Sequence, residues 1–398
     1  MQKLDKNNYI PRGVRLLEAN ATFCSRCVYD EYVPSIEFDE NGVCNYCKMI
    51  DDIDAIFKAG TDEGEQEFLR IVEEIKIKGK GKKYDCVIGV SGGTDSSYMV
   101  IKAVELGLRP LAVHYDNTWN TEIATQNITK VLEKIGVDLY TYVVNNKEMD
   151  DIFKSFIKAG VPDLDSPTDL ALAEVLYRVA NKYGVKYILE GHSYKTEGVS
   201  PLGYNYIDGG YIKTVQKKFG SHKIKTYPLM DFYSFLKWVA FKRIKKIRPF
   251  WYIKYNKEDA RAMLEEKYGW KYYGGHHLEN RMTAFWQSYY MPLRFDIDQR
   301  NNSLSASVRS GFMKREDAIQ SYTTAPYLED DLYEYFLKRM GWTREQFDEV
   351  MNQPNKTFRD YKTYKQRFER FRFLFYILAK ANLVPMSFYI KYTSKKEF

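Results

Sequence analysis

Residues 91–97, SGGTDSS, combine the features of a phosphate-binding loop with a carboxylate. The run follows an apolar segment, DCVIGV, and leads into a helical pattern that ends near Leu106. Its two glycines leave backbone N–H groups unhindered at a helix N-terminus, which attracts anions. A Walker loop would carry a lysine after its last glycine, and this run has none. We predict that phosphate is held by Ser91, Gly92, Gly93, Thr94, Asp95, Ser96 and Ser97.

Asp95 is the unusual member of this loop, because a carboxylate repels phosphate unless a cation lies between them. Carboxylate oxygens bind Mg²⁺ directly or through water, and the metal neutralises negative charge on phosphates. We therefore expect Asp95 to be a catalytic residue and a magnesium ligand. The alternative is an ordinary strand-to-helix turn, in which Asp95 is only an acid in the first turn of the helix.

Four of the five cysteines form two Cys-x-x-Cys pairs, which are 16 residues apart. This spacing is typical of a four-thiolate metal site. Zinc bound by four thiolates has no open position for water, so we expect a structural zinc ion. The alternatives are an iron–sulfur cluster on the same ligands and unrelated buried thiols. The ligands would be Cys24, Cys27, Cys44 and Cys47.

The fifth cysteine, Cys86, lies in the apolar segment before the loop and is expected in the core. A glutaminase needs a reactive, accessible cysteine with a histidine partner, and a sulfur-inserting enzyme usually needs a free cysteine or a cluster. The sequence offers no spare thiol on an obvious loop. If ammonia is the nucleophile, another polypeptide must therefore generate it.

Apolar strands and amphipathic helices alternate from Tyr84 to about residue 200. This pattern predicts a parallel sheet covered by helices on both faces, with ligands at the carboxyl ends of the strands. Gly191, His192 and Glu197 lie at or just after the end of the fourth strand, and Glu197 is the second candidate for a catalytic residue and magnesium ligand. Strands are expected at 85–90, 109–116, 138–144 and 185–191, and helices at 96–106, 122–135, 148–159 and 168–183.

The chain is expected to divide into three segments. They are a cysteine module with a helix at 1–80, a phosphate-binding domain at 81–230, and a helical region at 231–398 that completes the substrate or partner site. Thr343 and Gln346 form a capping box for a late helix, and 360–381 is expected to be another helix. The basic run KRIKKIR, 242–248, is either a solvated helix face or a surface for a nucleotide-sugar, a lipid-linked sugar or RNA.

The net charge does not distinguish between kinds of partner, whereas the hydropathy argues against a membrane-spanning segment. The net charge is +7, from 60 Lys and Arg against 53 Asp and Glu mixed along the chain. Such a balance suits an anionic substrate, a nucleic acid or an acidic partner equally well. No cationic leader precedes an apolar segment, and the longest apolar run, FLFYILA, is shorter than a bilayer crossing. We expect a cytoplasmic protein without a transmembrane segment.

The loop SGGTDSS resembles the SGGxDS signature of the PP-loop ATP pyrophosphatases. In that family the loop holds the β- and γ-phosphates as departing pyrophosphate while AMP is transferred to a substrate oxygen. The resemblance implies an adenine nucleotide alpha hydrolase-like fold. It also implies that the backbone of Val113 and His114 faces adenine and that Asp116 lies beside the nucleotide or metal. Alternatively, His114 is a strand-end histidine without a ligand.

Four stretches within residues 20–320 together resemble the bacterial N-acetyl sugar amidotransferases of the WbpG type, from lipopolysaccharide O-antigen biosynthesis. They are FCSRCVYDEYVPSIEFDENGVCNYC, YDCVIGVSGGTDSSY, LEGHSYKTEGVSPLGYNYIDGGYI and YYGGHHLENRMTAFWQSYYMPLRFDIDQR.

This second resemblance implies a reaction and a set of partners. The acetamido group of an N-acetylated sugar, of uronic acid type, becomes an acetamidino group, with ATP converted to AMP and pyrophosphate. The implied cofactors are ATP, Mg²⁺ and Zn²⁺. The sugar is free, nucleotide-linked or lipid-linked, and no nucleic acid is expected. Ammonia comes from a glutaminase subunit resembling that of imidazole glycerol phosphate synthase, in some cases with a cyclase-like companion.

The sequence departs from the family at one motif. The family pattern leads us to expect Gly-Gly-Lys followed by an arginine, whereas this chain has Gly-Gly-His-His at 274–277 and then Arg281. Arg281 is expected to be a catalytic residue that binds phosphate or a sugar carboxylate, but no lysine occupies the family position. His276 and His277 are weak metal candidates, because adjacent side chains usually point apart.

Two other functions fit part of this pattern. A PP-loop tRNA-modifying enzyme would also combine zinc, ATP and basic surface, although a larger net charge and a sulfur-carrying cysteine would be expected. A scaffold that binds zinc and nucleotide without catalysis is the third possibility.

Overall fold

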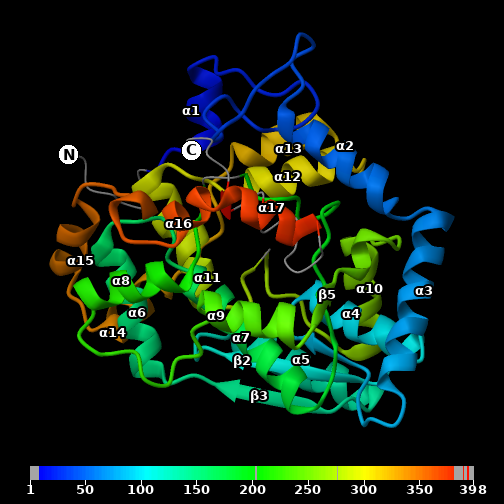
Figure 1. Ribbon diagram of the computed structural model, residues 1–398. Coiled ribbons are helices and arrows are strands. Elements are labelled where there is room, and N and C mark those ends of the chain that lie inside the picture. Colours follow the sequence, from blue (N-terminus) through cyan, green and yellow to red (C-terminus); the bar gives the residue numbers. More distant parts are fainter. Residues whose placement is uncertain (1–8, 202–203, 276, 381–388, 390–391, 394–398) are drawn as a thin grey trace.

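A five-stranded parallel sheet lies at the centre of the computed structural model, which describes residues 9–201, 204–275, 277–380, 389 and 392–393. The strand order is β3-β2-β1-β4-β5, and all neighbouring strands are parallel. Helices cover both faces (Figure 1), which confirms the predicted fold class. The strands are β1 (Cys86–Gly89), β2 (Pro110–Asp116), β3 (Leu139–Val143), β4 (Tyr187–Leu189) and β5 (Lys245–Ile247).

The helices before residue 230 include the four that the sequence predicted between the strands. They are α1 (Arg12–Glu18), α2 (Asn45–Phe57), α3 (Asp62–Gly79), α4 (Thr94–Glu105), α5 (Glu122–Ile135), α6 (Asn146–Ala159), α7 (Ser166–Lys182) and α8 (Gly209–Phe219).

The second half of the chain is mostly helical. Its elements are α9 (Phe232–Leu236), the π-helix η2 (Lys237–Phe241), the 3₁₀-helix η3 (Pro249–Trp251), α10 (Lys257–Tyr268), α11 (Arg281–Phe285), the π-helix η4 (Trp286–Phe295), α12 (Arg300–Arg309), α13 (Arg315–Tyr322), α14 (Leu332–Met340), α15 (Arg344–Met351), the 3₁₀-helix η5 (Phe358–Asp360), α16 (Lys365–Arg370) and α17 (Arg372–Lys380).

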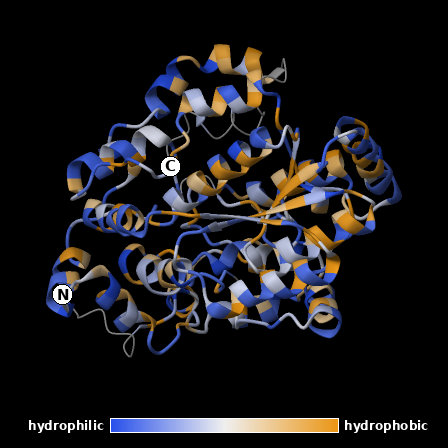
Figure 2. Ribbon diagram, turned by 90° about the horizontal axis from the view of Figure 1, so that it is seen from below, coloured by the Kyte–Doolittle hydropathy of each residue, from blue (hydrophilic) through white to orange (hydrophobic). Residues whose placement is uncertain are grey.

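The two faces of the sheet belong to separate hydrophobic cores, because successive residues of a strand point to opposite faces. In β1, Val87 packs into the core that contains α6 and α7, whereas Cys86 and Ile88 pack into the core with α3, α4, α5 and α10. Figure 2 shows the apolar strands between the two helical layers. Both sides of each central strand are thus fixed, and the strand ends that carry the loop are held in place.

The basic run at 242–248 was predicted as a possible helix face, and this was wrong. The π-helix ends at Phe241, and residues 245–247 form β5, the edge strand beside β4. Lys246 and Arg248 form ion pairs with Glu190, which follows β4. Part of the basic run therefore neutralises a carboxylate at the sheet edge.

The C-terminal predictions have mixed outcomes. The capping box of Thr343 and Gln346 is present at the start of α15. A single helix was expected at 360–381, but the described residues up to 380 form η5, α16 and α17. Helix α16 ends before Phe371, which separates it from α17. Among the described residues, none of the helices has both the length and the apolar character that a bilayer crossing requires.

The N-terminal cysteine segment packs against α12 and α13, which are distant from it in the sequence (Figure 1). Arg12 links Asp30 of this segment to Asp296, at distances of 2.8 and 2.9 Å. The division at 80 and 230 stays a prediction, and packing continues across both positions. Helix α3 packs on the sheet from before residue 80, and β5 and α10 join the same layer from beyond residue 230.

Candidate active site and metal centre

The predicted phosphate loop connects β1 to α4 at the carboxyl edge of the sheet. Gly92 adopts φ +82°, and a Cβ atom there would lie 2.2 Å from the carbonyl oxygen of Ala124. Only glycine suits this conformation and this space. The indole of Trp270 donates to the Gly92 carbonyl oxygen at 2.9 Å, so this carbonyl already has a hydrogen-bond partner.

The N-terminus of α4 follows directly, with Gly93 as its first flanking residue. Two side chains bond to backbone N–H groups at this helix end: the Ser91 hydroxyl accepts from Gly93 at 3.3 Å, and the Tyr273 hydroxyl accepts from Thr94. The Oγ atom of Ser96 accepts from the backbone N–H of Ser91 at 3.2 Å, and this contact closes the loop. The predicted residues 91–97 therefore lie together around one helix N-terminus, the arrangement that binds phosphate.

Asp95 is held by two donors at this terminus. The Tyr255 hydroxyl donates to Oδ1 and the Lys257 ammonium to Oδ2, both at 2.6 Å. Burial raises the pKa of Asp95, but the charge and hydrogen bond of Lys257 and the hydrogen bond of Tyr255 outweigh it and lower the pKa overall. Asp95 is thus a carboxylate at neutral pH, as a metal ligand must be.

Glu197 lies near Asp95, because the Lys257 ammonium is 3.9 Å from Glu197 Oε1. Burial and the negative charge of Asp95 raise the pKa of Glu197 to about 7, against the attraction of Lys257. When one carboxylate raises the pKa of another, a cation between the two stabilises the ionised form of both. The two predicted magnesium ligands are thus brought together, with one positive group between them.

Lys257 is a site residue that the sequence reasoning missed. It begins α10, 162 residues after Asp95, and only the packing of α10 on α4 brings it to the loop. Its pKa is raised, because the charges of Asp95 and Glu197 outweigh the effect of burial. The sequence contained one signal, an Asn256 cap before a lysine at the first helical position. This signal predicts where the helix begins, but not which part of the protein the lysine contacts.

Glu279 is a second residue that was missed. Its Oε1 accepts from the Ser91 hydroxyl at 3.3 Å, and its buried Oε2 has no hydrogen-bond partner among the described residues. His277 Nδ1 lies 3.8 Å from Oε1. Burial lowers the pKa of His277, but Glu279 and Glu197 raise it to about 9 overall. His277 therefore adds positive charge beside the loop; His276 lies outside the described residues.

Gly191 and His192 lie beside the loop as predicted. A Cβ atom on Gly191 would be 2.9 Å from the carbonyl oxygen of Asp95, so the β4 end packs directly on the first turn of α4. His192 accepts from the Trp251 indole at 3.1 Å and lies 3.9 Å from Glu197. Burial and the charge of Arg248 lower the pKa of His192 to about 4, so it is neutral at pH 7.

Val113, His114 and Asp116 lie at the carboxyl end of β2, the strand next to β1. The His114 ring is buried between the Val90 carbonyl oxygen at 3.0 Å and the Asn120 amide at 3.3 Å. Asp116 accepts from the Asn120 amide and from the backbone N–H of Thr118, at 2.9 and 2.7 Å. These contacts shape the loop after β2, and the expected adenine contacts stay a prediction.

Arg281 lies at the start of α11 and pairs with acidic residues outside the loop. Its guanidinium is 3.0 Å from Glu329 and 2.7 Å from Asp331, and it stacks on the Tyr335 ring. Among the residues that the structure describes, its side chain makes no hydrogen bond or ion pair with the loop, and its catalytic role stays a prediction.

A cavity of about 420 Å³ adjoins Glu197, whereas Asp95 and the other loop residues are not among the residues that line it. Its lining includes Glu197, His192 and His277. The rest of the lining contains a charged pair, several apolar residues, and many amide and hydroxyl side chains. Such side chains suit a ligand with several hydroxyl groups, and the volume is that of small-molecule sites. The polar lining includes Ser200, Gln287, Ser288, Gln299, Asn302, Ser303, Ser321 and Thr324.

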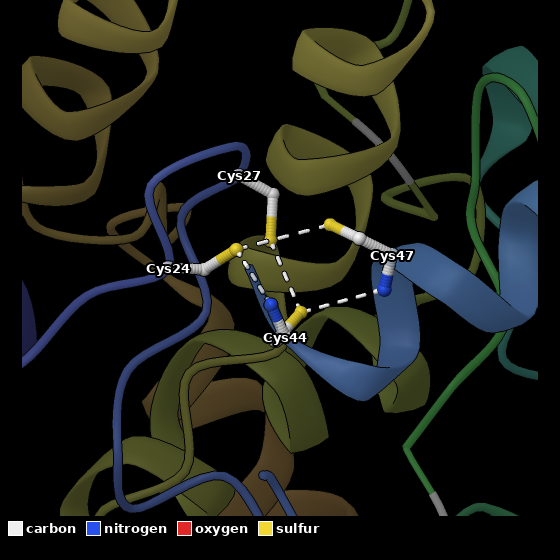
Figure 3. Close-up of side chains that lie close together, drawn as sticks. All are labelled: Cys24, Cys27, Cys44 and Cys47. Atoms are coloured by element: carbon white, nitrogen blue, oxygen red, sulfur yellow. Dashed lines mark hydrogen bonds between the residues drawn. The ribbon is translucent and has the colours of Figure 1, made fainter. Parts of the chain in front are cut away.

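The four predicted thiolate ligands converge as the spacing predicted. Their sulfur atoms lie within 4.8 Å of one another and are all buried (Figure 3). The Sγ atoms of Cys24 and Cys47 are 3.8 Å apart, as are those of Cys27 and Cys44. A tetrahedral zinc ion with bonds of about 2.3 Å separates its sulfur ligands by about 3.8 Å. The four cysteines therefore fit one metal ion.

Cys86 is buried within β1, and burial raises the pKa of its thiol. It is thus an unreactive core residue, as the sequence predicted. All five cysteines are buried, and none is an accessible nucleophile.

Part of the C-terminal half matches a known family. Residues 279–374 match the family model described as "LPS biosynthesis protein WbpG-like, C-terminal domain". This segment begins at Glu279 and contains Arg281 and the helices from α11 to α16.

Three curated relatives match in part. An uncharacterized protein of Methanocaldococcus jannaschii is 30% identical, over 42% of this chain and 58% of its own length. A glutamine-hydrolysing GMP synthase of Pyrobaculum aerophilum is 28% identical, over 47% and 33%. A tRNA-specific 2-thiouridylase of Limosilactobacillus reuteri is 26% identical, over 45% and 47%. The chain thus spans between 33% and 58% of the length of these relatives.

Among solved structures, a U34-tRNA thiolase of Methanococcus maripaludis with its 4Fe-4S cluster is 15% identical. The match covers 75% of this chain and 88% of that one, with a TM-score of 0.31. The loop geometry and the sequence matches together support the PP-loop ATP pyrophosphatase superfamily.

Proposed function

We propose that this chain is an ATP-dependent enzyme that forms AMP and pyrophosphate, and that it acts on the acetamido group of an N-acetylated sugar. The observation that carries the proposal is the pairing of Asp95 and Glu197 around Lys257 at the loop, with Glu197 on the cavity wall. The WbpG-like match over 279–374 supports the sugar as substrate.

The residues have distinct roles in this proposal. The amides and hydroxyls of 91–97 bind the β- and γ-phosphates at the N-terminus of α4. Mg²⁺, when bound, neutralises charge on the leaving pyrophosphate. Asp95 and Glu197 would hold it, through water or by displacing the Lys257 ammonium, because both Asp95 oxygens already accept hydrogen bonds. Lys257 and His277 add positive charge beside the phosphates.

The two chemical steps balance without a protein nucleophile. The amide oxygen of the sugar attacks the α-phosphorus, the bond to the β-phosphate oxygen breaks, and pyrophosphate leaves. Ammonia then adds to the imidate carbon, and AMP departs with the former amide oxygen. The amide nitrogen loses its proton to solvent, because Glu197 is assigned to Mg²⁺ in this proposal.

A sugar product is expected that has gained one nitrogen and lost one oxygen. The chain would be incubated with ATP, Mg²⁺, ammonium chloride and a panel of acetamido sugars, free, nucleotide-linked or lipid-linked, and the products measured by mass spectrometry. AMP should form in equal amount. AMP formation without a modified sugar across the panel would contradict the sugar as substrate, but not the use of ATP.

A glutaminase partner is part of the proposal, because all five cysteines are buried and glutamine hydrolysis needs an accessible nucleophile. Ammonium should therefore support turnover where glutamine alone does not. Turnover with glutamine in the purified chain would contradict this expectation.

The metal at the four cysteines is proposed to be zinc with a structural role. The purified protein should contain about one zinc ion per chain, and Cys44→Ala should release it and lower the melting temperature. Cys86→Ala is the matched control, because this cysteine is equally buried but lies in β1. Metal analysis and visible absorption distinguish zinc from an iron–sulfur cluster, whose brown colour would contradict the assignment.

A tRNA-modifying activity is the second candidate, favoured by the similarity to the 2-thiouridylase. Binding of tRNA would be lost steeply as salt rises, because each phosphate contact releases counterions. Binding of tRNA with such a salt slope, together with AMP formation that depends on tRNA, would favour this candidate over the sugar.

A further inference from the structure

The cysteine module touches the wall of the active-site cavity through one buried tyrosine. Tyr29 follows the first Cys-x-x-Cys pair and is fully buried. Its ring lies 5.5 Å from the guanidinium of Arg309, which also approaches Cys47 Sγ at 3.9 Å. The position of the Tyr29 ring is thus tied to the sulfur cluster by an arginine from α12.

The Tyr29 hydroxyl connects the cysteine module to the wall of the cavity. It donates to Oδ1 of Asn302 at 2.7 Å, and Asn302 lines the cavity from α12. The side chain of Asn302 packs on Gly198, where a Cβ atom would lie only 2.5 Å from Oδ1. Gly198 has φ +78° and directly follows Glu197.

These contacts form a continuous path from the cysteine cluster to the candidate magnesium ligand. Three further bonds hold the module on α12 and α13: Arg315 donates to the carbonyl oxygens of Cys24 and Cys27, and the Val28 backbone N–H donates to the Ser305 hydroxyl. Ser305 and Arg315 do not line the cavity, whereas Asn302, the partner of Tyr29, does.

We propose that Tyr29 and Asn302 are positioning residues, through which the metal-loaded cysteine module fixes the turn that carries Glu197. The inference deepens the proposed function, because it assigns the module a part in building the active site. A ring fixed by the metal cluster offers its hydroxyl at one place, and Asn302 then confines Gly198 and the Glu197 backbone. Without metal, the segment around Tyr29 loses its anchor, and the turn gains freedom.

The direct test is hydrogen exchange of the backbone amides at 193–201 in the full chain. Tyr29→Phe keeps the buried ring and removes only the hydroxyl. It should speed exchange of this segment about fivefold, the scale of one lost hydrogen bond, with the metal content unchanged. Removal of the metal by a chelator should speed exchange at the same amides. Tyr29→Phe exchange equal to wild type at 193–201 would overturn the proposal.

Tyr46→Phe is the matched control. Tyr46 lies in the same module and packs edge-on against Tyr29 at 5.6 Å, but its hydroxyl donates to the Pro34 carbonyl oxygen within the module. This variant should leave the exchange of 193–201 unchanged. An equal effect of both variants would show general loosening of the module, and would also overturn the proposed path.

Two further measurements complete the test. If Tyr29→Phe does not fold, Asn302→Ala removes the acceptor instead and should produce the same change in exchange.

The Mg²⁺ concentration for half-maximal pyrophosphate release should rise about fivefold in Tyr29→Phe, with kcat nearly unchanged, and should stay at the wild-type value in Tyr46→Phe. An unchanged Mg²⁺ requirement in Tyr29→Phe would contradict the role in positioning Glu197. The hydrogen-exchange measurement does not depend on catalysis. If exchange changes as expected but no pyrophosphate is released, the proposed function is contradicted and the positioning role of Tyr29 is not.

Discussion

Replacing Asp95 by asparagine should abolish the formation of AMP from ATP, with a loss of about a thousandfold or more. Asparagine keeps the size of the side chain and one oxygen acceptor, so the fold should persist. It removes the negative charge that would hold Mg²⁺ next to the phosphates. The measurement is pyrophosphate release at saturating ATP, with circular dichroism to confirm the fold.

Glu258→Gln is the control for this variant. Glu258 is exposed in the first turn of α10, next to Lys257, and pairs with Arg261 at the surface. It loses the same charge close to the site without touching the loop, and its activity should stay within about twofold of wild type. A fully active Asp95→Asn variant would show that Asp95 is not a metal ligand.

Gly92→Ala should both destabilise the protein and eliminate ATP binding. A side chain at φ +82° is strained, and its Cβ atom would collide with the Ala124 carbonyl oxygen at 2.2 Å. The two effects together should lower the free energy of unfolding by about 3 kcal/mol. The loop must also move away from α5, which misplaces the N–H groups around the helix N-terminus. Denaturant unfolding and calorimetric titration with ATP measure the two effects.

Gly136→Ala separates strain from collision. Gly136 ends α5 at φ +66°, and an added Cβ atom there would meet nothing within 4 Å. This variant should lose only about 1 kcal/mol of stability and bind ATP normally. If Gly92→Ala behaves in the same way, the loop does not depend on close contact with α5, and our account of its geometry is wrong.

Local sequence signals predicted the part of the site that is continuous in the chain. The glycine pair, the apolar strand before it and the helix after it are all encoded within residues 85–106. The two Cys-x-x-Cys pairs likewise predicted their own convergence, because four ligands and one tight turn lie within 24 residues. Such features depend on backbone conformation and short spacing, which a sequence displays directly.

Residues that reach the site from distant elements could not be predicted in this way. Lys257 and Glu279 occur in segments whose local pattern is an ordinary helix start and a turn. The strand β5 was missed because its three residues, KKI, are mostly charged, and only pairing with β4 makes them a strand. Tertiary contact decides these cases over local preference. The site thus consists of a predictable loop completed by residues that only the fold could reveal.

The bond between Arg315 and the carbonyl oxygen of Cys24 also has a consequence for biosynthesis, because it joins residues 291 positions apart. A ribosome adds 5 to 20 residues per second, so the cysteine segment waits roughly 15 to 60 seconds before its packing partners emerge. During that interval four thiols face the cell without their helical cover. Early capture of a metal ion would shield them from oxidation, so the cell's supply of that metal would influence how much newly made chain matures correctly.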